Sequence, residues 1–219
     1  MKSILAITLL SLIVVIPSTA QHNCPEGINL IPMYGTKKKC AEQLQSDSDF
    51  ITDCLKQFKD RKTAAHYFVK KGWEYFYKND SETAMKRFNQ AWLLDSLNAE
   101  AFWGFGNLMG MKSNFEESIK LLEHSIALDP NNSSVYESLA ISLGQLFYKT
   151  KNMEYLDKMT IALKKSLSIN PKNVRALVQL TTTYSYFVQK DSAVKYMKLT
   201  DQIDPAAVDP EVRKLILKK

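Results

Sequence analysis

The sequence predicts an all-α fold built from repeated units, and three observations support this prediction. The 219 residues include only seven glycines and seven prolines, whereas average usage of about 7% and 5% would give roughly 26 in total. This scarcity disfavours turn-rich β folds and long loops. Asp129-Pro130, Asn170-Pro171 and Asp204-Pro205 punctuate the chain at separations of 41 and 34 residues. Aligning the chain on these pairs brings further positions into register, which indicates an internal repeat.

The aligned positions have physical roles in a stack of helices. We expect Gly72, Gly106 and Ala140 to lie where two helices cross closely, because a bulky side chain there would force them apart. The positions eight residues before each punctuation point are expected to fill the seam between neighbouring units. Those seam positions are Phe88, Leu122, Leu163 and Met197.

This pattern resembles the tetratricopeptide repeat, a helix-turn-helix unit of 34 residues. The first unit carries the pattern in Gly72, Tyr75, Ala84, Phe88 and Ala91. The resemblance implies an all-α, right-handed solenoid of four units over residues 65–207. The expected units are 65–98, 99–132, 133–173 and 174–207. The third unit is seven residues longer than the others, so either each of its helices gains a turn or the loop around Lys149–Asn152 is longer.

The helix boundaries follow from end signals. A proline ends the second helix in three of the units, at Pro130, Pro171 and Pro205, whereas the first unit has Ser96 at this place. The expected N-cap residues of second helices are Asp80 or Ser81, Asn114 and Asp191. Ser134 followed by Glu137 predicts a capping box.

Segments on either side of the repeats are expected to cover the ends of the array. Residues 21–45 form an irregular N-terminal arm, and residues 46–64 hold a capping helix that starts at Ser46 or Asp47. Residues 208–219 form a C-terminal capping helix with one apolar face.

Residues 1–20 are predicted to be a secretory signal peptide. Lys2 precedes an apolar run of thirteen residues, too short to span a bilayer as a helix, and small residues follow it. We expect cleavage after Ala20 and export to the periplasm or beyond. An uncleaved membrane anchor is the alternative. The mature chain is expected to have no transmembrane segment.

The three cysteines lie in the first third of the chain. In an oxidising compartment we expect one pair to be joined and one thiol to be left over. Cys54 lies on the apolar face of a short helix, which favours a buried free thiol. A disulfide between Cys24 and Cys40 would close the irregular segment between them into a loop, but the cysteine count alone leaves the pairing open. Metal binding is disfavoured, because no two cysteines have the close spacing of a zinc knuckle.

The sequence carries no arrangement typical of catalysis. None of His22, His66 and His124 has a second histidine or a cysteine at ligand spacing. The glycines at 104, 106 and 110 lie within a predicted helix, so close helix packing explains them better than a phosphate loop. The net charge is +6, but basic residues are scattered, which disfavours nucleic acid as a partner. We therefore predict a non-enzymatic protein without a cofactor or a bound metal.

The resemblance also implies a binding surface, because first helices line a concave groove in this family. Some family members grip a terminal carboxylate with lysine and asparagine, and those residues are missing here at the matching positions. Phe76 and Trp103 have an alternative role, packing between first helices or against the arm. The candidate partner-binding residues are Trp73, Phe76, Tyr77, Trp103, Asn107, Met111, Ile141, Gln145, Arg175, Gln179, Thr182 and Tyr186.

The function implied is therefore an interaction module that binds a peptide or protein partner in its groove. An accessory subunit that docks onto a larger envelope complex through its N-terminal arm or convex face is the alternative. The sequence identifies neither the partner nor the oligomeric state.

Overall fold

The structure, a computed structural model, describes residues 24–35, 37–187 and 189–218. The predicted signal peptide over residues 1–20, with its cleavage site at Ala20, lies outside the described residues. No helix in the described ranges combines the length and the apolar character needed to cross a bilayer.

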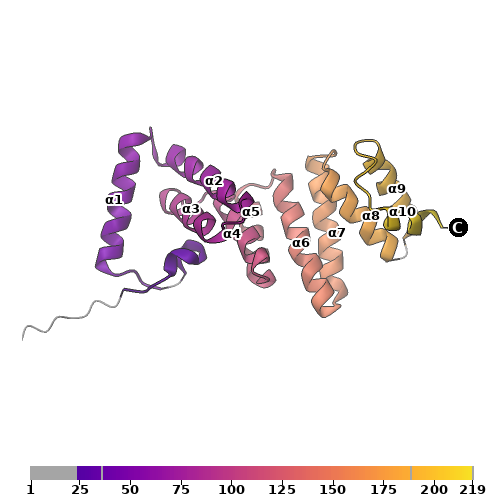
Figure 1. The fold of residues 1–219 in the computed structure, drawn as a ribbon, viewed down its shortest axis with the longest axis horizontal. Helices are drawn as coiled ribbons and strands as arrows, with labels where there is room; N and C mark the ends of the chain where they lie inside the picture. Colours follow the sequence, from indigo (N-terminus) through magenta and orange to yellow (C-terminus); the bar gives the residue numbers. More distant parts are fainter. Residues whose placement is uncertain (1–23, 36, 188, 219) are drawn as a thin grey trace, which may run out of the picture.

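The described chain is all-helical, and its helices follow one another along an elongated solenoid (Figure 1). Four antiparallel pairs form the repeat, α2 with α3, α4 with α5, α6 with α7 and α8 with α9. This is the predicted fold class. The eight helices are α2 (Arg61–Tyr77), α3 (Ser81–Leu94), α4 (Ala99–Met111), α5 (Phe115–Leu128), α6 (Ser133–Thr150), α7 (Met153–Ile169), α8 (Val174–Tyr186) and α9 (Lys190–Asp201).

The seam positions predicted from the repeat are buried. Phe88, Leu122 and Leu163 have no exposed surface, and Met197 is 4% exposed. A Cβ atom on Gly72 would lie 2.5 Å from the Phe88 ring, and one on Gly106 would lie 2.6 Å from Leu122. The predicted close crossings are therefore confirmed at both glycines.

The third unit accommodates its extra residues by lengthening both helices. α6 has 18 residues where α4 has 13, and α7 has 17 where α5 has 14. The turn between α6 and α7 contains only Lys151 and Asn152.

The N-terminal capping helix α1 (Ala41–Gln57) begins five residues before the predicted start at Ser46. The side chain of Gln43 accepts a hydrogen bond from the Cys40 backbone N–H at 3.2 Å and donates one to the Pro25 carbonyl at 2.8 Å. Part of the predicted arm over residues 21–45 is thus helical. The capping residue is a cysteine rather than the serine or aspartate that usually marks a helix start.

The first repeat helix also starts early. α2 begins at Arg61, because the Asp60 carboxylate accepts a hydrogen bond from the Thr63 backbone N–H at 2.8 Å. The predicted boundary between residues 64 and 65 therefore falls inside a helix. Aligning the repeats shows which positions recur from unit to unit. It does not show where a helix begins, because that is set by the N-cap residue.

The remaining N-cap predictions have mixed outcomes. Asp80 caps α3 through the Thr83 N–H at 3.0 Å, as predicted. The capping box at Ser134 is wrong, because Asn132 caps α6 two residues earlier. Asn114 precedes α5 without a side-chain cap bond, and α9 begins before Asp191, at Lys190.

The N-terminal arm packs against α3. It contains two short 3-10 helices, η1 (Ile28–Leu30) and η2 (Pro32–Tyr34), and returns beneath α3 in Figure 1. A disulfide joins Cys24 to Cys40 at the start of α1, whereas Cys54 is free and buried. The arm is therefore covalently tied to α1 and closes a loop over the first unit.

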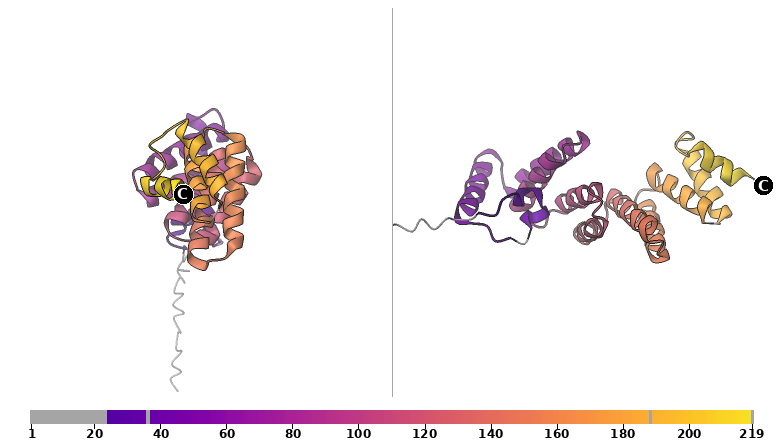
Figure 2. Two further views of the ribbon diagram at one scale, coloured as in Figure 1. Left: turned by 90° about the vertical axis from the view of Figure 1, so that its right-hand side faces the viewer. Right: turned by 60° about the horizontal axis from the view of Figure 1, so that its bottom comes forward.

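The C-terminal helix α10 (Pro210–Leu217) packs against α8 and α9 at the far end of the solenoid (Figure 2). Val212 and Ile216 bury its apolar face. The Arg213 guanidinium donates hydrogen bonds to both oxygens of Asp201, at 2.9 and 2.6 Å, and these bonds lower the pKa of the Asp201 carboxyl. A charge-assisted pair thus holds α10 to the last repeat helix.

Candidate functional site

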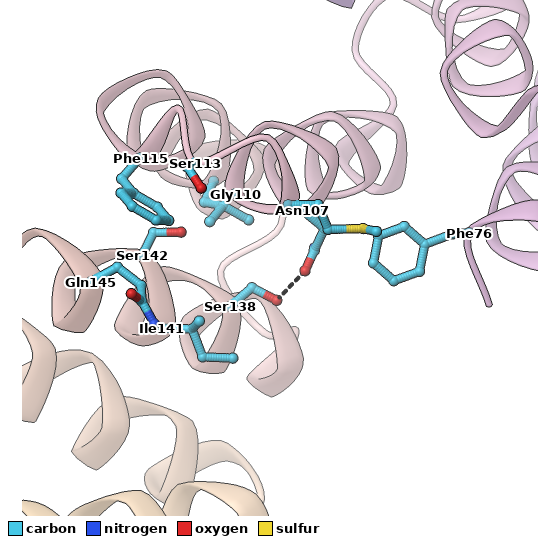
Figure 3. A pocket seen from close by; sticks show the side chains of 11 residues that line it. Phe76, Asn107, Gly110, Ser113, Phe115, Ser138, Ile141, Ser142 and Gln145 are labelled. Carbon is cyan, nitrogen blue, oxygen red and sulfur yellow. Dashed lines mark hydrogen bonds between the residues drawn. The ribbon is translucent and has the colours of Figure 1, made fainter. Parts of the chain in front are cut away.

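A cleft of about 380 Å³ opens between α4 and α6, where α4 ends against the middle of the longer α6 (Figure 3). Its size is at the lower end of the range typical of ligand pockets. Both helices are the first helices of their units. The cleft is lined by Phe76, Asn107, Gly110, Met111, Ser113, Phe115, Leu122, Ser138, Ile141, Ser142 and Gln145.

The lining is uncharged, although about a quarter of the whole sequence is charged. Met111 and Ile141 are the exposed apolar side chains of the cleft, with exposed fractions of 50% and 47%. Hydroxyl and amide side chains supply the polar part. An uncharged lining of this kind favours neutral groups and gives long-range charge little influence on binding.

Part of the candidate partner-binding set lines this cleft. The members that do so are Phe76, Asn107, Met111, Ile141 and Gln145. Trp73, Tyr77 and Trp103 lie beside the cleft rather than in its lining. The fourth unit contributes none of the lining, so Arg175, Gln179, Thr182 and Tyr186 are separate from it.

Trp73 and Trp103 form an aromatic cluster between the first two units. Their ring centroids are 4.3 Å apart, and Trp73 also contacts the rings of Phe76 and Phe88 at 5.2 Å. Tyr77 stacks on Trp73 and remains 74% exposed. The packing role that the sequence left open for Phe76 and Trp103 is therefore present, and Tyr77 is the exposed member of the cluster.

Trp103 is fixed by a closed hydrogen-bond network. Its indole N–H donates to the Ser138 hydroxyl at 2.9 Å, and Ser138 donates to the Asn107 side-chain oxygen at 3.2 Å (Figure 3). The Asn107 amide in turn donates to the Trp103 carbonyl at 2.8 Å. Ser138 and Asn107 thus link α4 to α6 and hold one wall of the cleft in place.

A second hydroxyl network lies under the opposite part of the cleft. Ser118 is fully buried and donates to the Gly106 carbonyl at 2.7 Å. The Ser118 and Ser142 hydroxyl oxygens are 2.8 Å apart. Because a serine has one hydroxyl proton, Ser142 donates to Ser118. Ser142 lines the cleft, is 3% exposed, and keeps unused acceptor capacity on its oxygen.

Gly110 differs from the other two glycines of α4. A Cβ on Gly104 or Gly106 would overlap Phe88 or Leu122 at 2.4 to 2.6 Å. A Cβ on Gly110 would meet only the hydroxyl oxygens of Ser118 and Ser142, at 3.4 and 3.5 Å, which is ordinary contact. Close helix packing therefore explains Gly104 and Gly106, but that explanation is wrong for Gly110.

Ser113, Phe115 and Ser142 also line the cleft, and no sequence pattern assigned them to it. Phe115 is half-buried at the start of α5. The spacing of serines in the sequence does not show whether a serine lies on the floor of a cleft or on an exposed helix surface. Only the proximity of α4, α5 and α6 brings these side chains together.

The candidate residues of the fourth unit lie on α8. The Arg175 guanidinium is 3.4 Å from the Glu137 carboxylate and remains largely exposed. Tyr186 is 62% exposed at the end of the helix, and Gln179 and Thr182 are half-buried. An exposed ion pair of this kind contributes little to stability.

One cluster in the described chain has the residue types of a metal site. The ligand-type atoms of Cys24, Cys40 and Glu42 lie within 4.8 Å of one another. The two sulfur atoms are bonded to each other, so they offer no thiolate to a metal ion.

Comparison with known proteins gives matches at the level of structure. No protein-family model matches the sequence, and no curated protein matches it. TTC0263 of Thermus thermophilus, a thermophilic tetratricopeptide-repeat protein, has a TM-score of 0.57 and 17% identity, covering 69% of this chain and 79% of its own.

Two further solved structures are similar over comparable lengths. YrrB, a tetratricopeptide-repeat protein with an unusual peptide-binding site, has a TM-score of 0.55 and 19% identity, with coverage of 71% of this chain and 75% of its own. MamA has a TM-score of 0.54 and 24% identity, with coverage of 77% and 96%. Together with the repeat in the sequence, these matches show that the chain has the tetratricopeptide-repeat fold.

Proposed function

We propose that this protein is a non-catalytic interaction module that binds a peptide segment of a protein partner in the cleft between α4 and α6. The observation that carries the proposal is the pair of exposed apolar side chains, Met111 and Ile141, beside an uncharged cleft of about 380 Å³. Apolar side chains that converge on a concave surface are typical of binding sites rather than of a solvated helix face. The peptide-binding site of YrrB, which shares the fold, supports this class of function.

We also propose that the protein is exported and acts in the periplasm or outside the cell after cleavage near Ala20. The disulfide between Cys24 and Cys40 supports an oxidising compartment, because cytosolic thiols are kept reduced. The basic and apolar order of residues 2–16 supports the same location.

Replacing Met111 and Ile141 together by alanine should weaken partner binding at least about tenfold, because buried anchor residues carry most of the energy of an interface. The ligands are peptides selected from a displayed random library on the purified wild-type protein. Their affinities for wild-type and variant protein are measured by isothermal titration calorimetry.

The chain offers a matched control in Met153 and Ile161, which are also a methionine and an isoleucine, 53% and 67% exposed on α7. Neither lines the cleft. The Met153→Ala, Ile161→Ala variant should bind the selected peptides with unchanged affinity. Equal losses in both double variants, or no loss in either, would show that the peptides bind elsewhere.

A further inference from the structure

We propose that the cleft recognises an aromatic side chain that carries a hydrogen-bond donor, as tyrosine and tryptophan do. This inference rests on the proposed function, since it assigns the chemistry of the partner's anchor residue. Three features of the cleft lead to it: its aromatic and apolar walls, the polarity of its floor and the glycine that leaves this floor uncovered.

The walls favour an aromatic group. Phe76 and Phe115 lie at opposite ends of the cleft in Figure 3, with Ile141 along its α6 side. Met111 also lines it, and a thioether makes favourable contacts with aromatic rings. A cavity of about 380 Å³ has room for a large side chain but is small for a long peptide segment. Because the lining is uncharged, a charged anchor would lose its hydration without gaining an ionic partner.

The floor favours a donor. The chain of hydroxyl groups runs from Ser142 to Ser118 to the Gly106 carbonyl, so the proton of each serine is already used. The Ser142 oxygen keeps a free lone pair, and Ser142 lines the cleft. A phenol or an indole N–H can donate to it, whereas the ring of phenylalanine cannot.

Gly110 leaves this acceptor accessible. Glycine inside a helix costs about 0.5–1 kcal/mol relative to alanine, and neither packing nor backbone conformation requires it at this position. Alanine would place its Cβ 3.4 Å from the Ser118 oxygen and 3.5 Å from the Ser142 oxygen. We expect this methyl group to narrow the approach to the Ser142 oxygen. We therefore assign Gly110 as a specificity-determining residue. It leaves the bound side chain a path to the hydroxyl of Ser142, which lines the cleft and is 3% exposed, whereas Ser118 is buried behind it.

The test uses three neutral probes, N-acetyl-tyrosinamide, N-acetyl-phenylalaninamide and N-acetyl-leucinamide. Each is titrated into protein labelled on methionine and isoleucine methyl groups, and binding is followed by NMR. The Met111 and Ile141 signals are assigned from the Met111→Leu and Ile141→Val variants. The tyrosine probe should shift both signals and bind about fivefold more tightly than the phenylalanine probe, the effect of one net hydrogen bond. The leucine probe should bind most weakly.

Two variants test the floor. Ser142→Ala should reduce tyrosine affinity to the phenylalanine level and leave phenylalanine affinity unchanged. Gly110→Ala should also abolish the preference, and its melting temperature should not fall, because alanine is the better helix former. The matched control is Ser125→Ala, which removes another buried serine, bonded to the Ala99 carbonyl outside the cleft. It should keep the preference.

The outcomes separate this inference from the proposed function. If the tyrosine and phenylalanine probes bind with equal affinity, the cleft does not recognise a hydrogen-bond donor, and the inference is overturned. Shifts of the Met111 and Ile141 signals would still show that apolar groups bind in the cleft. The inference is also overturned if no probe shifts the Met111 and Ile141 signals. In that case the library peptides and their calorimetry still decide independently whether the cleft binds peptides.

Discussion

Replacing Phe88 by alanine is expected to lower the free energy of unfolding by about 3–5 kcal/mol, the usual cost of deleting a buried phenylalanine ring. The ring has no exposed surface and lies between α2 and α4, against the backbones of Gly72 and Gly104. It also contacts Trp73 at 5.2 Å and Phe105 at 6.2 Å between ring centroids. The loss should appear in urea unfolding followed by circular dichroism.

A double-mutant cycle with Gly104 tests whether the ring and the glycine fit each other. A Cβ on Gly104 would lie 2.4 Å from the Phe88 ring, so Gly104→Ala alone should cost about 1–3 kcal/mol through overpacking. In the Phe88→Ala background the same change should stabilise by about 1 kcal/mol, because alanine favours the helix. If Gly104→Ala has the same effect in both backgrounds, the close contact does not determine the packing of these units.

Removing the disulfide by the Cys24→Ser, Cys40→Ser substitutions is expected to destabilise the protein by about 3 kcal/mol, because the unfolded chain regains the conformational entropy that the crosslink removes from a loop of this length. The sequence separation is 16 residues. The arm that the bridge ties down supplies two carbonyls, those of Asn29 and Ile31, to the buried Asn89 amide at 2.9 Å. Release of the arm therefore also leaves a buried polar group without its partners.

The same experiment carries its own control. Dithiothreitol should lower the urea midpoint of the wild type and leave that of the double-serine variant unchanged. Amide hydrogen exchange should accelerate in η1 and η2, and remain slow in α6 and α7, because contacts in a solenoid run mainly between neighbouring elements. A wild-type midpoint insensitive to reduction would show that the arm is held by its packing alone.

The repeat was predictable from sequence because it depends on periodic burial. Phe88 and Leu122 recur at the same place in each unit, and Gly72 and Gly106 recur opposite them. The arm was less predictable, since its contacts depend on single residues. The Gln43 side chain accepts a hydrogen bond from the backbone N–H of Cys40, the N-cap residue of α1, and no pattern in the chain distinguishes this glutamine from the others.

The cleft was only partly predictable for a similar reason. Family resemblance placed first-helix residues such as Met111 and Gln145 on the concave side, and the structure brings them together. The contribution of Ser142 depends on its contact with Ser118, 24 residues away. The glycines of α4 look alike in sequence, and only the distances around them separate Gly110 from Gly104.

Site-specific photocrosslinking in cells would show whether a protein partner occupies the cleft between α4 and α6. A benzoylphenylalanine residue is placed at position 141 in the cleft, at 161 on α7 or at 44 on α1, all exposed isoleucine or leucine positions. We expect a crosslinked protein partner from position 141, and its loss when Met111 is also replaced by alanine. Crosslinks from position 44 or 161 with none from 141 would contradict binding in the cleft, and would point to docking through the N-terminal region or the convex face.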